Sequence, residues 1–407
     1  MCCSYAKTAA FLAIFAAVAG GVYVLEQRAV VEAAGTQAPR FEVDPMWPKP
    51  LPNHWIMGAT IGVGVDAKDN VWVIHRGGSL EEKERYATWT PKASECCVPA
   101  PPVLAFSPAG DLIANWGGSD GPGYEWPSSN HGIDVDHKGN VWIGGNGRGK
   151  LPAALAHDES KMAAAGAVHD SMLLKFTQTG KFLMNIGKPF ESKGSNDVAN
   201  LRLPAKSIVD PKTNELYVAD GYGNRRVIVF DADTGAYKRH WGAYGKKPED
   251  TPLPPRAQII QGPPPALFNN PVHAVVVSND DVVYVADRGN NRLQVFALDG
   301  TFVREVFIKR DTLQNEGTVH DFAFSPDKEQ RFLYVVDGSN KWVRILNRKT
   351  LEIVDSVGGR AGHGAQEFFH IHSMAVDSKG NIYLGEVNQG QRYMKYAFKG
   401  MGAPSAP

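Results

Sequence analysis

A short pattern of apolar and aromatic residues recurs along the chain and predicts its fold. In each unit an apolar strand ends near an acidic or hydroxyl residue, and a turn containing Gly, Asn or Asp usually follows. A second strand then places one aromatic residue between two apolar ones. These second strands are Val71-Trp72-Val73, Val141-Trp142-Ile143, Leu216-Tyr217-Val218, Val283-Tyr284-Val285, Leu333-Tyr334-Val335 and Ile382-Tyr383-Leu384. Six copies of a strand-turn-strand unit indicate a repeat architecture.

Most units continue into a third and a fourth strand, joined by another turn. The sixth unit stops after its third strand, at Phe398, and Phe41-Glu42-Val43 ahead of the first unit is the candidate for its missing strand. Four-stranded units around a central channel form an all-β six-bladed β-propeller, in which a terminal strand closes the last blade. A linear solenoid is the alternative architecture, but it does not need the first strand to complete the last unit.

Three segments interrupt the period: residues 80–103, 147–170 and 245–268. The second is rich in alanine, and we expect a short helix at residues 162–168. Long insertions in a propeller lie on its faces, where they either shape a binding site or form solvent-exposed loops.

The first residues have a composition of their own. Lys7 precedes an uncharged run at residues 8–25, and Ala17-Val18-Ala19 fits a small-residue cleavage site. Residues 1–35 are therefore predicted to be a signal peptide or an uncleaved membrane anchor, followed by the propeller at 36–400 and a tail at 401–407. Either reading makes the protein extracytoplasmic: secreted, periplasmic or tethered to the membrane through this segment alone.

The charge balance excludes some partners and leaves others open. Lys plus Arg and Asp plus Glu both number 43, so no overall field favours nucleic acid or an anionic membrane. Any charged ligand must be met by local groups. The adjacent Cys96 and Cys97 would form a vicinal disulfide, ligate a soft metal, or be two loop thiols without a role.

The histidines occupy one position of the repeat. Counting back five residues from the end of each first strand gives Ile61, His131, Ala205, His273, His320 and His372. The chain has only 12 histidines in 407 residues, so four at one position are not expected by chance.

The first strand of a blade is innermost, and blades two, four and six are about 120° apart. We therefore expect His131, His273 and His372 to meet near the axis. Three neutral imidazoles with an open position are typical of catalytic zinc, Zn²⁺. His320 breaks the threefold pattern and would be a fourth ligand, a group that hydrogen-bonds to the ligands, or a proton carrier. His370 lies near the same mouth of the channel.

A second register adds Arg76 and Arg288, which follow the second strands of units one and four, and Tyr222 in unit three. Arginine suits bidentate capture of a carboxylate, and a phenol beside a cation can serve as a base. The alternative is that each arginine pairs with a blade carboxylate such as Asp220 or Asp287.

These motifs resemble known proteins over roughly residues 41–399. Val218-Ala219-Asp220-Gly221-Tyr222-Gly223-Asn224-Arg225 and Val285-Ala286-Asp287-Arg288-Gly289-Asn290-Asn291-Arg292 resemble NHL repeats. The joint pattern is similar to the peptidyl-α-hydroxyglycine α-amidating lyase (peptidylamidoglycolate lyase) family. The matching stretches are Ile74-His75-Arg76-Gly77, Asn130-His131-Gly132-Ile133, Asp220-Gly221-Tyr222, Pro271-Val272-His273, Ala286-Asp287-Arg288 and His372.

The resemblance implies a zinc-dependent lyase. In that family the three histidines bind zinc, which engages the α-hydroxyl of a carbinolamide. Tyr222 would then remove the hydroxyl proton as the C–N bond breaks, giving an amide and glyoxylate. Arg76 would position the substrate, with Arg288 a weaker candidate for the same role. The resemblance further implies that a separate monooxygenase supplies the hydroxyglycine substrate.

The chain departs from the family at four places. The acidic ligand of the family's structural calcium, Ca²⁺, is Ser373 here, and a methionine is replaced by His370. The family's cysteine beside the active tyrosine is Gly223, and His320 is an addition.

Two further function classes therefore stay open. One is a non-catalytic extracytoplasmic propeller that binds a protein, peptide or glycan and tolerates loss of the histidines. The other is a metal-binding or redox-accessory protein that uses the histidine cluster together with Cys96 and Cys97.

Overall fold

Six antiparallel sheets of four strands each make up the protein, as seen in a computed structural model that describes residues 37–149 and 168–405. Residues Phe41–Phe398 form one compact unit. The predicted signal or anchor segment lies outside the described residues, as does all but the last residue of the predicted helix at 162–168. In the part of the chain that is described, no helix has the length and apolar character needed to cross a membrane.

The first three blades follow one another along the chain. Blade 1 consists of β3 (Ala59–Val65), β4 (Val71–Arg76), β6 (Val103–Phe106) and β7 (Leu112–Trp116). Blade 2 consists of β8 (Asn130–Val135), β9 (Asn140–Gly145), β10 (Met172–Thr177) and β11 (Phe182–Gly187). Blade 3 consists of β12 (Lys206–Asp210), β13 (Glu215–Asp220), β14 (Arg226–Asp231) and β15 (Tyr237–Trp241).

The last three blades repeat this order, except that the sixth borrows a strand. Blade 4 consists of β16 (Val272–Val277), β17 (Val282–Asp287), β18 (Arg292–Ala297) and β19 (Phe302–Phe307). Blade 5 consists of β20 (Val319–Phe324), β21 (Phe332–Asp337), β22 (Trp342–Asn347) and β23 (Ile353–Gly358). Blade 6 consists of β26 (Ile371–Val376), β27 (Ile382–Glu386), β28 (Arg392–Gly402) and β1 (Ala38–Asp44).

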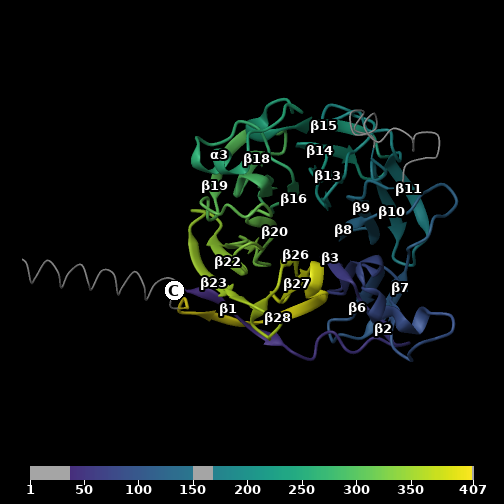
Figure 1. The fold of residues 1–407 in the computed structure, drawn as a ribbon. Coiled ribbons are helices and arrows are strands. Elements are labelled where there is room, and N and C mark those ends of the chain that lie inside the picture. The colour runs from purple at the N-terminus through teal and green to yellow at the C-terminus, as the bar shows by residue number, and fades with distance from the viewer. Residues whose placement is uncertain (1–36, 150–167, 406–407) are drawn as a thin grey trace, which may run out of the picture. The chain divides into compact units, whose positions relative to one another are not determined.

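The ring is closed. Each innermost strand contacts the innermost strand of the next blade, and β26 contacts β3 (Figure 1). The predicted closing strand is confirmed, because β1 is the outer strand beside β28, where the Phe41 and Phe398 rings lie 6.0 Å apart between centroids. The all-β six-bladed propeller predicted from the sequence is therefore confirmed, and the solenoid alternative was wrong.

The acidic residue after the first strand ties the inner hairpin together. Asp66 accepts hydrogen bonds from the backbone N–H of Lys68 and Asn70 and from the Trp72 indole at 3.1 Å. Asp136 and Asp377 accept the corresponding bonds in blades 2 and 6. The acidic residue, the turn and the aromatic residue therefore recur together, because one carboxylate accepts hydrogen bonds from two backbone N–H groups of the turn and from the aromatic side chain.

A buried acid–arginine pair links the second and third strands in blades 3 to 6. The pairs are Asp220–Arg226 (2.9 Å), Asp287–Arg292 (2.7 Å), Asp337–Arg344 (3.2 Å) and Glu386–Arg392 (2.6 Å). The acidic side chains are fully buried in all four. Removing one partner leaves an uncompensated buried charge, which costs about 3–5 kcal/mol.

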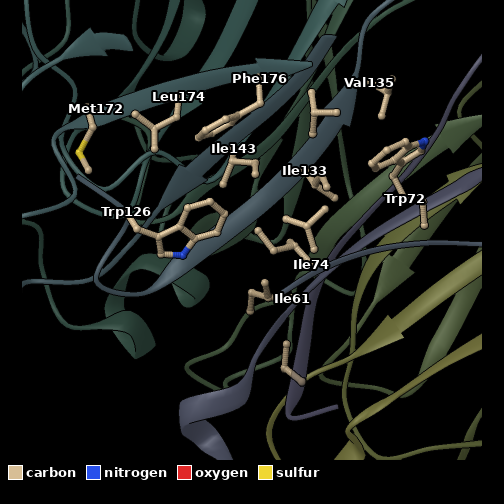
Figure 2. Close-up of a cluster of buried hydrophobic side chains, with 14 residues drawn as sticks. Ile61, Trp72, Ile74, Trp126, Ile133, Val135, Ile143, Met172, Leu174 and Phe176 are labelled. Carbon is tan, nitrogen blue, oxygen red and sulfur yellow. The ribbon is translucent and has the colours of Figure 1, made fainter. Parts of the chain in front are cut away.

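Apolar side chains fill the space between neighbouring blades. Figure 2 shows this between blades 1 and 2, where Ile61 and Ile74 pack near Ile133 and Ile143. The central aromatic residue of every second strand is buried, in agreement with the alternation read from the sequence.

The insertions carry short elements. Residues 80–103 contain the 3₁₀ helix η2 (Glu82–Thr88) and β5 (Val98–Pro99), which pairs in parallel with β2 (Trp55–Ile56). Cys96 and Cys97 in this insertion are joined by a disulfide. The remaining elements are η1 (Gly77–Ser79), η3 (Ala243–Gly245), α3 (Arg256–Gln261), η4 (Arg288–Asn290), β24 (Arg360–Ala361), β25 (Glu367–Phe368) and η5 (Asn388–Gly390).

Candidate metal centre and active site

Three histidines from alternate blades meet at one mouth of the ring. His131, His273 and His372 come from the starts of β8, β16 and β26, and their ligand atoms lie within 4.8 Å of one another. All three are buried, and their ring centroids are 4.6–5.2 Å apart. We call these residues the three-histidine cluster.

Backbone carbonyls orient each imidazole of the three-histidine cluster. The Nδ1–carbonyl pairs are His131–Ala205 (2.7 Å), His372–Ile61 (3.0 Å) and His273–His320. A carbonyl can only accept, so each pair places the imidazole proton on Nδ1 and leaves the Nε2 lone pair free. The three acceptors hold the repeat position of the histidines, one blade further along.

The free lone pairs point at one another. His273 Nε2 and His372 Nε2 are 3.0 Å apart, and neither nitrogen carries a proton to share in this arrangement. Two facing lone pairs repel in a buried site unless a positive group lies between them. The donor set therefore fits a divalent ion with three neutral nitrogen ligands and an open position.

Burial keeps these ligands neutral. Loss of hydration lowers the pKa of all three histidines well below the usual range, and the nearby Arg288 guanidinium adds to the effect. Arg76 adds to it at His131 only. A neutral imidazole is the form that binds a metal, so no proton has to leave at physiological pH.

The Tyr222 hydroxyl lies against the three-histidine cluster. Its oxygen is 3.1 Å from His131 Nε2 and 3.0 Å from His273 Nε2, and it accepts a hydrogen bond from Arg288 at 3.0 Å. Tyr222 thus sits where it can exchange a proton with a group bound in the open position.

Among the described residues, neither Arg76 nor Arg288 forms an ion pair with Asp220 or Asp287. Asp220 and Asp287 pair with other arginines, as described above. Arg288 instead forms an ion pair with Glu316, which the sequence analysis did not identify.

Arg76 is held by neutral groups. It donates to the Asn130 carbonyl at 3.1 Å and to Asn146 Oδ1 at 2.6 Å. Within residues 37–149 and 168–405, no carboxylate forms an ion pair with it. Burial lowers its pKa from the ordinary arginine value, and Tyr222 and Asp170 oppose that shift. A half-buried guanidinium without a carboxylate partner among the described residues is suited to binding an anionic ligand.

A groove of about 660 Å³ begins at Arg76. Its walls include η1, Pro99 of the first insertion, and the segment before β8 with Trp126 and Pro127. The insertion at residues 80–103 therefore shapes a surface beside the site, which leaves room for a ligand much longer than one residue.

A second group of ligand-type side chains adjoins the first. Glu316, His320 and His370, which we call the second cluster, also place their ligand atoms within 4.8 Å of one another. Both histidines are buried. Glu316 lies in the loop before β20, outside the repeat register, so no pattern in the sequence pointed to it.

The side chains that line the cavity beside the three-histidine cluster do not fit a calcium ion. Lys206 forms a 2.7 Å ion pair with Asp321, and the nearby Ser373 offers only a neutral hydroxyl. Calcium takes six to eight oxygen ligands, and the Lys206 ammonium would repel it. Ser373, which stands where the resemblance implies an acidic ligand, and the Lys206 ammonium both disfavour calcium at this position.

Comparisons with known proteins show which sequences this chain resembles. The NHL repeat pattern matches residues 268–296. The chain is 25% identical over 343 residues to peptidyl-glycine alpha-amidating monooxygenase A of Xenopus laevis, covering 82% of this chain and 31% of that protein. It is 26% identical over 276 residues to peptidyl-alpha-hydroxyglycine alpha-amidating lyase 2 of Drosophila melanogaster, covering 65% and 54%. The resemblance to the amidating lyases is confirmed. This chain spans about a third of the length of the first curated relatives.

Two other similarities complete the comparison. NHL repeat-containing protein 3 of Homo sapiens is 24% identical over 370 residues, covering 87% of this chain and 84% of that protein. A solved streptogramin B lyase structure matches with 13% identity and a TM-score of 0.47, covering 89% of this chain and 98% of that one.

Proposed function

We propose that this protein is a secreted zinc-dependent lyase that cleaves the carbinolamide C–N bond of a peptidyl-α-hydroxyglycine, giving a peptide amide and glyoxylate. The observation that carries this proposal is the convergence of three neutral Nε2 lone pairs beside the Tyr222 hydroxyl. The named activity of the Drosophila relative supports it. A zinc ion held by His131, His273 and His372 would supply Lewis acidity toward a bound oxygen.

The protein's own residues account for the proton transfers. Tyr222, whose hydroxyl oxygen accepts a hydrogen bond from Arg288, takes the proton of the α-hydroxyl. The carbinol carbon then forms its C=O bond as the C–N bond breaks, and the amide nitrogen takes up a proton that Tyr222 can return. The products are an amide and glyoxylate, so atoms and charge balance without an oxidant or reductant.

Arg76 and the adjoining groove account for binding. A hydroxyglycine substrate ends in a carboxylate, and Arg76 offers a half-buried guanidinium without a carboxylate partner among the described residues. The groove beside Arg76 would hold the peptide portion. Because the reaction consumes a hydroxylated glycine, a separate monooxygenase would have to supply it. The proposal includes no calcium and no thiolate ligand.

The test is glyoxylate release from N-benzoyl-α-hydroxyglycine by the purified, zinc-loaded protein. We expect glyoxylate and benzamide in equal amounts, with turnover lost in Tyr222→Phe. A folded protein that holds zinc and releases no glyoxylate from this compound or from hydroxyglycine peptides would overturn the lyase proposal. Detection of the processed protein outside the cell, by its mature N-terminus, tests secretion separately.

We propose a non-catalytic function as the second candidate, because one relative that is matched over most of its length is named for its repeats alone. The match to the human NHL repeat-containing protein 3 covers 84% of that protein, whereas the match to the Xenopus monooxygenase covers 31%. A non-catalytic propeller that binds a protein, peptide or glycan would use the groove at Arg76. It would keep its ligand affinity in His131→Ala, whereas the lyase would lose its turnover.

A further inference from the structure

The second cluster has the composition of a metal site in its own right. We propose that Glu316, His320 and His370 bind a second divalent transition-metal ion beside the three-histidine cluster. Two imidazole nitrogens and one carboxylate oxygen are a ligand set used by catalytic zinc and by non-haem iron. The inference does not rest on the lyase reaction, because it concerns only which ions the protein holds.

The geometry brings these ligand atoms together from separate elements. His320 lies near the start of β20 and His370 directly before β26, and their Nε2 atoms are 3.1 Å apart. Glu316 approaches from the loop before β20. The two histidines are buried, while the Glu316 side chain is 43% exposed. The carboxylate thus lies on the solvent side of a buried nitrogen pair, which leaves an ion a path into the site.

Glu316 has an oxygen available for an ion. Its Oε2 accepts a hydrogen bond from Arg288, which also reaches the Tyr222 hydroxyl. A carboxylate has two oxygens with about four lone-pair positions, so Oε1 can bind a cation while Oε2 keeps Arg288. An ion here would therefore be linked to the three-histidine cluster through Glu316, Arg288 and Tyr222.

A metal-free arrangement of the same atoms exists and defines the alternative. Asn388 would donate to His370 Nδ1 at 3.4 Å, and His370 Nε2 would donate to His320 Nε2. His320 Nδ1 would then face the Thr318 carbonyl at 3.5 Å. Turning the Asn388 carboxamide by half a turn reverses the first bond, moves the His370 proton to Nδ1 and frees both Nε2 atoms.

The two sites are close enough to affect each other. The His320 ring centroid is 5.9 Å from that of His273 and 6.0 Å from that of His372, and the His320 carbonyl accepts the His273 proton. Two dications at this separation repel each other in a poorly hydrated site. The three-histidine cluster holds three rigidly oriented ligands and should load first, with the second cluster following at higher metal concentration.

The experiment is a zinc titration of the metal-free protein, with bound zinc counted by mass spectrometry after gel filtration. We expect two zinc ions per chain, bound in two steps. His370→Met should remove the weaker step and keep the tighter one, because methionine fills a similar buried volume without an imidazole ligand. Glu316→Gln should weaken the same step at least tenfold. His240→Gln, a change at a partly exposed histidine on β15, is the matched control and should keep both steps.

Cobalt gives an independent readout, since each tetrahedral site adds its own visible absorption. If His370→Met does not fold by circular dichroism, His320→Gln replaces it. The inference is overturned if the wild-type protein takes up one ion, or if a second ion persists in folded His370→Met and His320→Gln. Two ions without glyoxylate release would support this inference while overturning the lyase proposal, and one ion with glyoxylate release would do the reverse.

Discussion

The His131 Nδ1 donates to the backbone carbonyl of Ala205, which holds the same repeat position one blade further along. The same relation joins His372 to Ile61 and His273 to His320. Even-numbered blades therefore supply the ligands and odd-numbered blades supply the carbonyls that orient them. A side-chain substitution does not remove a backbone acceptor, so the ring itself keeps the imidazoles oriented.

Loss of one histidine should abolish tight metal binding. With His131→Ala only two oriented nitrogens remain, and we expect the tightly bound zinc to fall from about one per chain to a small fraction of that. Mass spectrometry on protein purified without added metal measures this. His240→Gln serves as the control, and retention of stoichiometric tight zinc in His131→Ala would rule out the three-histidine site.

Removal of the Tyr222 hydroxyl should separate catalysis from metal binding. Tyr222→Phe keeps the ring but loses the atom that touches His131, His273 and Arg288. We expect kcat to fall by about 10²–10⁴, the usual worth of a positioned acid or base, with zinc content unchanged. If zinc is lost together with activity, the phenol is a ligand rather than a base.

Arg76→Gln should raise KM for substrates that carry a free carboxylate. A hydrogen bond to a charged group contributes roughly 1.5–3 kcal/mol, which corresponds to a factor of about 10–150. Steady-state glyoxylate release from N-benzoyl-α-hydroxyglycine measures the change. Its methyl ester is the control, because the wild-type protein and the variant should differ little on it. An equal loss on both compounds would show that Arg76 does not recognise the carboxylate.

Asp134 should make stability depend on pH. Burial raises its pKa to about 7, and one carboxylate oxygen has no hydrogen-bond partner. The unfolded chain releases this proton near pH 4, so stability should fall as the pH rises from about 4 to 7 and stay low above that. Asp134→Asn should be more stable than the wild type by about 1–3 kcal/mol at pH 8, and equally stable at pH 4.

Urea unfolding of the metal-free protein at the two pH values tests this prediction. The metal is removed first because metal affinity depends on pH, so a bound ion would add its own pH dependence to the measured stability. A difference between Asp134→Asn and the wild type that does not change with pH would contradict the assignment.

Metal binding should not depend on the cysteines. Cys96 and Cys97 are joined to each other in the first insertion, which leaves no thiolate for an ion. We expect the double variant Cys96→Ser/Cys97→Ser to keep its full zinc content. Loss of zinc in that variant would restore the redox-accessory reading that the disulfide argues against.

The repeat made much of this architecture predictable. The alternation of apolar residues predicts the strands, and the alignment of the six units predicts the number of blades and the closing strand. The same alignment gives the shared position of His131, His273 and His372. The orienting carbonyls belong to Ala205, Ile61 and His320, and a backbone acceptor leaves no mark in residue type. The shared repeat position of these three residues was nonetheless visible when the six units were aligned.

Two pairings could not be predicted from residue type or periodicity. Asp287 and Arg288 are adjacent in sequence, but Asp287 ends β17 while Arg288 begins η4. Asp287 instead faces Arg292 directly across β17 and β18, while Arg288 turns toward Glu316. Glu316 lies in an irregular loop, where no periodicity applies.

Because β1 completes blade 6, the position of this strand also determines the order in which the blades can fold. Blades 1 to 5 are each made from one continuous stretch of chain, so each can form as soon as it is synthesised. Blade 6 needs β1 and β28 together, and the loop between them spans the whole propeller, so its closure is expected to come last and to be slow. Until then β28 presents an open edge, which β1 of a second molecule could fill as well as its own.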